Sequence, residues 1–181
     1  MLASGSGTVL RALLEAELPV AFVLADRRCA ALDIARDAGA AALLLERTDF
    51  SKGFDRDGYT DEVLAAMAPF DVDLVAIAGF GTVIPKAATA FPDRILNTHP
   101  SLLPAFKGWH PVRDALAYGV KVTGCTVHVV TEEVDAGPIL AQEPVRVLPG
   151  DTEEALHERI KEVERRLYPE TIRDYLESIR R

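Results

Sequence analysis

Short apolar segments alternate with amphipathic segments along the first half of the chain. The apolar segments span residues 20–24, 41–45, 72–78 and 94–98, and helical patterns span 8–16, 30–38, 59–67 and 85–90. Nearly continuous apolar segments are typical of strands that are buried on both sides. Their alternation with helices predicts a mostly parallel sheet covered on both faces, so we expect a doubly wound α/β fold.

The pattern changes after residues 111–118, which are expected to form a helix. Segments 121–130 and 139–147 have the length and apolar content of two long strands. The short connection between them, residues 131–138, predicts an antiparallel C-terminal pair. The second half of the chain therefore departs from the parallel arrangement expected for the first.

The C-terminal segment predicts one long helix that ends near Ile179. Asp151 is followed three residues later by Glu154, which is the spacing of a capping box at a helix start. Pro169 lies inside this segment and is expected to kink or break the helix. Because no repeat or linker interrupts the chain, we expect residues 1–181 to form a single domain.

The first strand of the expected sheet is short. Only Met1, Leu2 and Ala3 precede the glycine-rich segment that begins at Ser4. A doubly wound fold opens with a strand of about 5–6 residues before such a segment. We expect a truncated first strand, which a misassigned start codon would explain. Restoring about five upstream residues should then raise the melting temperature.

Composition and charge narrow the classes of function. The chain has 181 residues, 49% of them hydrophobic and 27% charged, as in ordinary globular proteins. Its net charge of −8 argues against non-specific nucleic-acid binding, so an anionic ligand must be met by local cations. No apolar stretch approaches the ~20 residues of a membrane helix, and no leader pattern is visible, so we expect a cytoplasmic protein. Cys29 and Cys125 lack metal-site spacing, and we expect free thiols and no metal.

Three polar residues are the strongest candidates for chemistry. Asn97 and His99 are two residues apart at the end of an apolar segment, and strand alternation sends both side chains to one side. Asp135, on a later glycine-containing loop, could complete a set of amide, imidazole and carboxylate. Such a set is suited to acyl transfer. The alternatives are a buried core histidine and a simple turn-forming aspartate. His128 lies in an expected strand, where its role is mainly structural or supports the site from behind.

From Ser4 to about Tyr175 the sequence resembles the formyltetrahydrofolate-dependent formyltransferases. The matching motifs are Asn97-x-His99-Pro100-Ser101-Leu102-Leu103-Pro104, Gly108, Asp135-x-Gly137-Pro138-Ile139, Ser4-Gly5-Ser6-Gly7-Thr8, Ala78-Gly79-Phe80, Glu164 and Tyr168-Pro169. The resemblance is strongest to members that formylate glycinamide ribonucleotide in purine biosynthesis. It implies that N10-formyltetrahydrofolate is the formyl donor, that Asn97 and protonated His99 stabilise the oxyanion, and that Asp135 orients and charges His99 and aids proton transfer. It also implies that about residues 1–98 form the phosphate-binding half and about 99–181 the folate-binding and catalytic half.

The same resemblance implies two sets of binding residues. Those for the ribonucleotide and its phosphate are Gly5, Ser6, Gly7, Thr8, Arg56, Lys161 and Glu164, and those for the folate are Thr82, Val83, Ile84, Thr131, Val134 and Ala136. From the residues alone, the glycine loop could be a plain turn and the charged side chains a solvated surface. Val9 stands where the family usually has asparagine, and Gly81-Thr82 where it often has Met-Arg. We therefore expect weaker ribonucleotide binding and altered contacts to the folate tail.

Four alternative functions remain open at this point. A formyltetrahydrofolate hydrolase shares the Asn, His and Asp set but usually carries an additional N-terminal domain. Formyltransferases that act on initiator tRNA have a further C-terminal domain and a basic surface, unlike this acidic chain. A non-catalytic folate-binding relative and a generic nucleotide-binding module are the other two, and the second leaves the Asn97 and His99 pair unexplained. We expect a monomer or homodimer.

Overall fold

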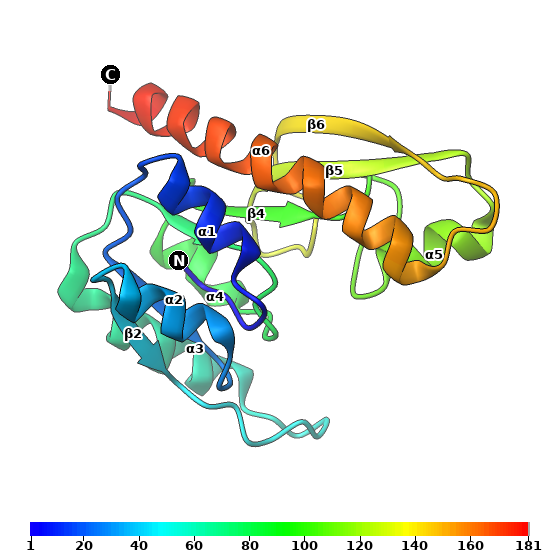
Figure 1. Cartoon of the computed structure of the whole chain (residues 1–181). Helices are drawn as coiled ribbons and strands as arrows, with labels where there is room; N and C mark the ends of the chain where they lie inside the picture. Colours follow the sequence, from blue (N-terminus) through cyan, green and yellow to red (C-terminus); the bar gives the residue numbers. More distant parts are fainter. Residues whose placement is uncertain (181) are drawn as a thin grey trace.

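The computed structural model describes residues 1–180, apart from the side chain of Pro85 (Figure 1). In chain order the elements are α1 (Thr8–Glu15), β1 (Phe22–Ala25), α2 (Ala30–Asp37), β2 (Ala41–Leu44), α3 (Arg56–Met67), the 3₁₀ helix η1 (Ala68–Phe70), β3 (Val75–Ile77), α4 (Pro85–Ala90), β4 (Ile95–His99), α5 (Pro111–Tyr118), β5 (Val122–Val129), β6 (Ile139–Arg146) and α6 (Glu153–Ile179). The expected helices and strands are therefore confirmed. Their largest boundary differences are three residues, at the starts of α3 and β3.

The strands form two groups that a short N-terminal segment joins. β1 pairs with β2 in parallel, and a second group has the order β3-β4-β5-β6. β3 and β4 are parallel, whereas β4–β5 and β5–β6 are antiparallel, as expected for the C-terminal pair. Leu2 forms parallel bridges to both Leu24 and Ile77. The segment 1–3 thus occupies the central place expected for the first strand, between β1 and β3.

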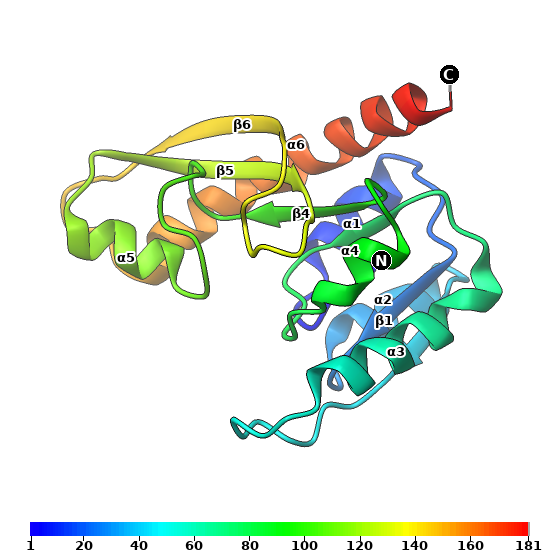
Figure 2. The ribbon, with the colours of Figure 1, turned by 180° about the vertical axis from the view of Figure 1, so that it is seen from behind.

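Side chains alternate between two apolar cores on opposite faces of the sheet. Val23, Leu96 and Val127 lie in the core shared with α1, α2 and α6, which are nearest the viewer in Figure 1. Phe22, Leu24 and Ile95 lie in the core shared with α3 and α4, which are nearest the viewer in Figure 2. The period of two places neighbouring strand residues in different cores. This arrangement confirms the doubly wound fold.

The start of α6 differs by one residue from the expectation. The N-cap is Thr152, whose Oγ1 accepts a hydrogen bond from the backbone nitrogen of Ala155 at 3.2 Å. Asp151 instead accepts from the backbone of Leu148 at 2.7 Å and pairs with Arg159 at 2.8 Å. The capping box expected from Asp151 and Glu154 was therefore wrong, because a second capping residue follows Asp151 directly.

The long helix α6 also continues through Pro169, so of the expected kink or break the break is wrong. A proline inside a helix costs about 3 kcal/mol through its missing N–H and its ring. Here Pro169 is buried, and the hydroxyl of the preceding Tyr168 donates to the carbonyls of Ile77 at 3.1 Å and Leu96 at 2.8 Å. Packing on the sheet therefore holds the helix together at this point. Among the helices described over residues 1–180, none combines the length and apolar character needed to cross a bilayer.

Candidate active site

A cavity of about 260 Å³ opens where β3 and β4 end, at the edge where doubly wound folds bind ligands. Most of its walls are apolar, and the segments that line it are widely separated in the sequence. They include Ile77, Phe80, Val83, Ile84, Asn97, His99, Gly108, Trp109, His128, Val130, Val134 and Asp135. Of the six residues expected to bind folate, five line this cavity, namely Thr82, Val83, Ile84, Thr131 and Val134. Ala136 is exposed and lies outside the lining.

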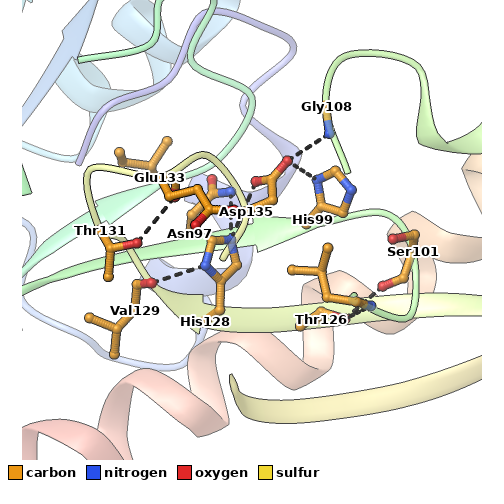
Figure 3. A network of polar contacts seen from close by, with 12 residues as sticks. Asn97, His99, Ser101, Gly108, Thr126, His128, Val129, Thr131, Glu133 and Asp135 are labelled. Atoms are coloured by element: carbon orange, nitrogen blue, oxygen red, sulfur yellow. Dashed lines mark hydrogen bonds and ion pairs between the residues drawn. The ribbon is translucent and has the colours of Figure 1, made fainter. Parts of the chain in front are cut away.

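Asn97, His99 and Asp135 all line this cavity and lie close together (Figure 3). Nδ1 of His99 is 3.5 Å from Oδ2 of Asp135, and the same carboxylate oxygen accepts from the backbone nitrogen of Gly108 at 2.8 Å. Nε2 of His99 lies 2.8 Å from the carbonyl oxygen of Phe106. A carbonyl can only accept, so Nε2 carries a hydrogen and Nδ1 is the nitrogen directed at Asp135.

Local backbone geometry fixes the position of Asp135. Its φ of 53° lies in the left-handed region, where Asp is tolerated better than most residues. Two residues later, Gly137 passes so close to the carbonyl of Val129 that a Cβ there would collide with it. The glycine therefore allows the loop to return against β5, and Asp135 is presented to the cavity.

The imidazole of His128 lies beside the same carboxylate. Its side chain is buried, with Nε2 3.6 Å from Oδ1 of Asp135 and 3.2 Å from Nδ2 of Asn97. Burial lowers the pKa of His128, outweighing the opposing influence of Asp135. Asn97 and His128 are direct partners in the β4–β5 register. Sequence reasoning gave His128 no definite place in the site, although cross-strand pairing could have indicated one.

The glycine loop before α1 is formed but lies outside the cavity lining. Gly7 is the N-cap of α1 with φ of 74°, and a Cβ there would clash with Ile34, so both geometry and space require glycine. The loop contacts the cavity wall through Ser4, whose Oγ accepts from the backbone of Gly81 at 3.1 Å. Gly5 and Ser6 are exposed. The free N–H groups at the start of α1 could meet an anion there.

Asp26 links this loop to the cavity wall and was not identified from the sequence. It is fully buried at the end of β1 and accepts hydrogen bonds from Thr82 Oγ1 at 2.9 Å and Arg27 Nε at 2.9 Å. Burial alone would raise the pKa of this carboxyl, but hydrogen bonds from Arg27, Ser4 and Thr82 lower it. A polar residue directly after an apolar strand was the available signal.

The remaining residues expected at the ribonucleotide site lie on other elements, and none lines the cavity. Nη1 of Arg56 donates to the carbonyl of Val83 at 3.0 Å, so this side chain contacts the cavity wall from outside. Nζ of Lys161 lies 3.6 Å from Glu158. Glu164 is partly exposed on α6, and desolvation raises the pKa of its carboxyl despite a hydrogen bond from Thr98. Within residues 1–180, no group of three or more His, Cys, Asp or Glu side chains is arranged to hold a metal ion.

Comparison with known proteins adds an independent line of evidence. The family described as Formyl transferase matches residues 1–172. A phosphoribosylglycinamide formyltransferase of Mycobacterium tuberculosis (strain CDC 1551 / Oshkosh) is 50% identical over 173 residues, which cover 92% of this chain and 79% of the relative.

Solved structures agree with the sequence comparison. Glycinamide ribonucleotide transformylase 1 from Symbiobacterium toebii superposes with a TM-score of 0.89 at 45% identity, covering 98% of this chain and 86% of that one. A formyltetrahydrofolate deformylase from Pseudomonas syringae superposes with a TM-score of 0.86 at 26% identity, covering 98% of this chain and 60% of that one. The match over residues 1–172 and the 50% identity establish that the chain belongs to the formyl transferase family.

Proposed function

We propose that this protein transfers the formyl group of N10-formyltetrahydrofolate to the amine of glycinamide ribonucleotide, a step of purine biosynthesis. The observation that carries the proposal is the convergence of Asn97, His99 and Asp135 on one cavity. The 50% identity to a phosphoribosylglycinamide formyltransferase supports this choice of acceptor. We also propose that the reaction takes place in the cytoplasm and that the protein is a monomer or homodimer.

In the proposed reaction the amine attacks the formyl carbon, and the bond from that carbon to N10 then breaks. The formyl oxygen carries the developing negative charge in the tetrahedral intermediate. An N–H of Asn97 and the Nδ1–H of protonated His99 donate to that oxygen. The amine loses one proton and N10 gains one, and Asp135 relays this proton directly or through an ordered water.

The folate is proposed to occupy the cavity, and the ribonucleotide the region next to it. Thr82, Val83, Ile84, Thr131, Val134 and Ala136 would contact the folate ring system. The phosphate would meet the N–H groups of Gly5, Ser6, Gly7 and Thr8, together with Lys161 and Arg56, and Glu164 would bind the glycinamide. On this assignment about residues 1–98 supply most of the phosphate-binding groups together with Thr82, Val83 and Ile84 of the folate site. About residues 99–181 supply the other folate residues and His99 and Asp135, together with Lys161 and Glu164 for the ribonucleotide. Arg56 would have to leave the carbonyl of Val83 to reach a phosphate.

The test is release of tetrahydrofolate from N10-formyltetrahydrofolate, measured with and without glycinamide ribonucleotide. Release that requires the ribonucleotide, with formylglycinamide ribonucleotide as the product, is expected. Release that ignores the ribonucleotide and yields formate would overturn the proposal.

Hydrolysis of the formyl folate is the second candidate function, because the fold also matches a formyltetrahydrofolate deformylase with a TM-score of 0.86. It would use water in place of the amine at the same three side chains. Product analysis by mass spectrometry separates the two reactions, since only the transferase adds the formyl mass to the ribonucleotide.

A further inference from the structure

His128 holds a position that the proposed reaction does not use. Its side chain is only 2% exposed, and the ring lies beside both Asn97 and Asp135 (Figure 3). Nδ1 is 3.0 Å from the carbonyl oxygen of Val129, and Nε2 is 3.2 Å from Nδ2 of Asn97. Nε2 is also 3.6 Å from Oδ1 of Asp135.

These contacts assign a tautomer to the ring. The carbonyl of Val129 can only accept, so Nδ1 must carry a hydrogen. Burial lowers the pKa of His128, which disfavours a second hydrogen on the ring. Nε2 is then an acceptor, and the group that donates to it is the Nδ2 of Asn97. A neutral His128 with hydrogen on Nδ1 satisfies the hydrogen bonds to Val129 and Asn97, and it leaves no hydrogen for Oδ1 of Asp135.

We propose that His128 is a positioning residue that fixes the orientation of the Asn97 carboxamide, so that its remaining N–H is available to the formyl oxygen. This inference rests on the proposed function for the role of Asn97. An amide has a donor end and an acceptor end, and rotation by about 180° exchanges them at little cost. Without an acceptor at Nε2, the amide oxygen could turn toward the developing negative charge and repel it.

The two histidines beside Asp135 thereby take different roles. His99 contacts Oδ2 of the carboxylate through Nδ1, while its Nε2–H is held by Phe106. His128 faces Oδ1 through an Nε2 that has no hydrogen to share. The titratable groups that face His128 are Asp135 and His99. A neutral His128 donates no hydrogen to the carboxylate, which leaves the carboxylate to interact with His99.

A matched pair of substitutions tests the positioning role. In His128→Gln the amide end reaches the place of Nε2 and can accept from Asn97. In His128→Asn it reaches only the place of Nδ1 and can donate to Val129. We expect His128→Asn to lower kcat by about 10-fold or more with little change in either KM, and His128→Gln to recover most of that loss. Equal losses in the two variants would overturn the proposal.

A double-mutant cycle with Asn97→Ala separates positioning from a general structural effect. If His128 acts through Asn97, adding His128→Asn to Asn97→Ala should change kcat by less than about twofold. A loss as large as in the wild-type background would show that His128 acts independently of Asn97 and would overturn the proposal.

The tautomer can be measured on the ligand-free wild-type protein. In ¹H–¹⁵N spectra of the imidazoles, His128 should show a protonated Nδ1 and an unprotonated Nε2 from about pH 6 to about pH 8. A hydrogen on Nε2 would overturn the inference even if every variant folds poorly. The spectrum requires neither substrate. It can therefore contradict the tautomer of His128 independently of whether glycinamide ribonucleotide is the formyl acceptor.

Discussion

Single side chains at the end of β4 limit the chemistry that this cavity can support. Asn97 supplies an uncharged donor, whereas both nitrogens of His99 face protein oxygens. In the proposed mechanism a substrate oxygen would therefore compete with Asp135 for Nδ1 of His99. The amide of Asn97 is the donor that needs no change in protonation state.

Replacing Asn97 by alanine should lower kcat by about 10²–10³-fold, because one oxyanion donor is removed. KM for each substrate should change much less, since the interaction develops only in the transition state. Steady-state kinetics with both substrates measure the two effects. A kcat within about threefold of wild type would contradict the role proposed for Asn97.

Thr123 carries a cost in stability that the fold does not require. Its hydroxyl is buried and has no hydrogen-bond partner among the described residues. Thr123→Val keeps the shape and removes the unsatisfied group, so the free energy of unfolding should rise by about 1 kcal/mol. Urea denaturation measures the change. Thr123→Ser, which keeps the hydroxyl and loses a methyl group, is the control and should be less stable than wild type.

Glu164 provides a prediction with a defined pH dependence. Its burial raises the pKa of the carboxyl above the ordinary 4.5, so the charged form destabilises the folded protein above the raised value. Glu164→Gln should therefore unfold at higher urea concentration than wild type at neutral pH. The difference should vanish as the pH falls below 4.5, where both folded and unfolded chains are protonated.

Glu164→Gln should also raise KM for glycinamide ribonucleotide by about 10-fold, because the proposed hydrogen bond between the charged carboxylate and the glycinamide is lost. Glu158→Gln is the matched control on the same helix. Glu158 is exposed, and its hydrogen bond to Arg165 lowers the pKa of its carboxyl, so its substitution should give no stabilisation at neutral pH. If Glu158→Gln stabilised the fold, or Glu164→Gln destabilised it, the raised pKa assigned to Glu164 would be contradicted.

At the scale of elements, local patterns determined what the structure contains, and packing determined where each element stops. The apolar segments 20–24 and 94–98 became β1 and β4 with small shifts, because burial on both faces enforces the pattern. The two errors lie on α6. Thr152 replaced Asp151 as cap, and contacts of Tyr168 with the sheet outweighed the proline that follows it.

The assignment of Thr152 as the cap of α6 can be checked directly. Thr152→Ala should lower the free energy of unfolding by about 1 kcal/mol, because the first turn loses its side-chain acceptor. Thr152→Ser retains an oxygen at that position and should stay within about 0.5 kcal/mol of wild type. Thermal or urea unfolding distinguishes the two variants. An equal loss of stability in both would contradict Thr152 as the cap and favour Asp151.

At the scale of the whole molecule, the site depends on contacts between segments that are distant in the sequence. Asp26 and Thr82 are 56 residues apart, and Asn97 and His128 are 31 apart. Alternation placed Asn97 and His99 on the cavity, but no periodicity links either to Asp135. The residues alone offered Asp135 only as a carboxylate that could complete the set, and the resemblance to a family assigned it to the site. Asp26 and the pairing of His128 emerged only from the folded chain, since their partners lie on other strands and loops.

Asp26→Asn tests the connection between the glycine loop and the cavity wall. The substitution removes a charge that Arg27 and Thr82 both contact in a fully buried position. We expect the free energy of unfolding to fall by about 2 kcal/mol at neutral pH. Because the pKa of Asp26 is lowered, this stabilisation should persist above 3.8 and be lost as the pH falls below it.

The variant should also raise KM for both substrates, since Asp26 holds Thr82 in the cavity wall and contacts Ser4 beside the glycine loop. Asp33→Asn is a suitable control, because Asp33 is exposed and, among the described residues, its ion pair is with Arg36. An increase in KM for only one of the two substrates would show that the glycine loop and the cavity wall at Thr82 are held independently of each other.

Trp109 lines the cavity, is 64% exposed, and is the one tryptophan of the chain. The indole emission of the protein therefore comes from a single place, one residue away from the N–H that holds Asp135. Any ligand that fills the cavity must shield this ring from water and from dissolved acrylamide. The enzyme thus carries an intrinsic optical probe of occupancy, by which binding can be followed in variants that no longer turn over.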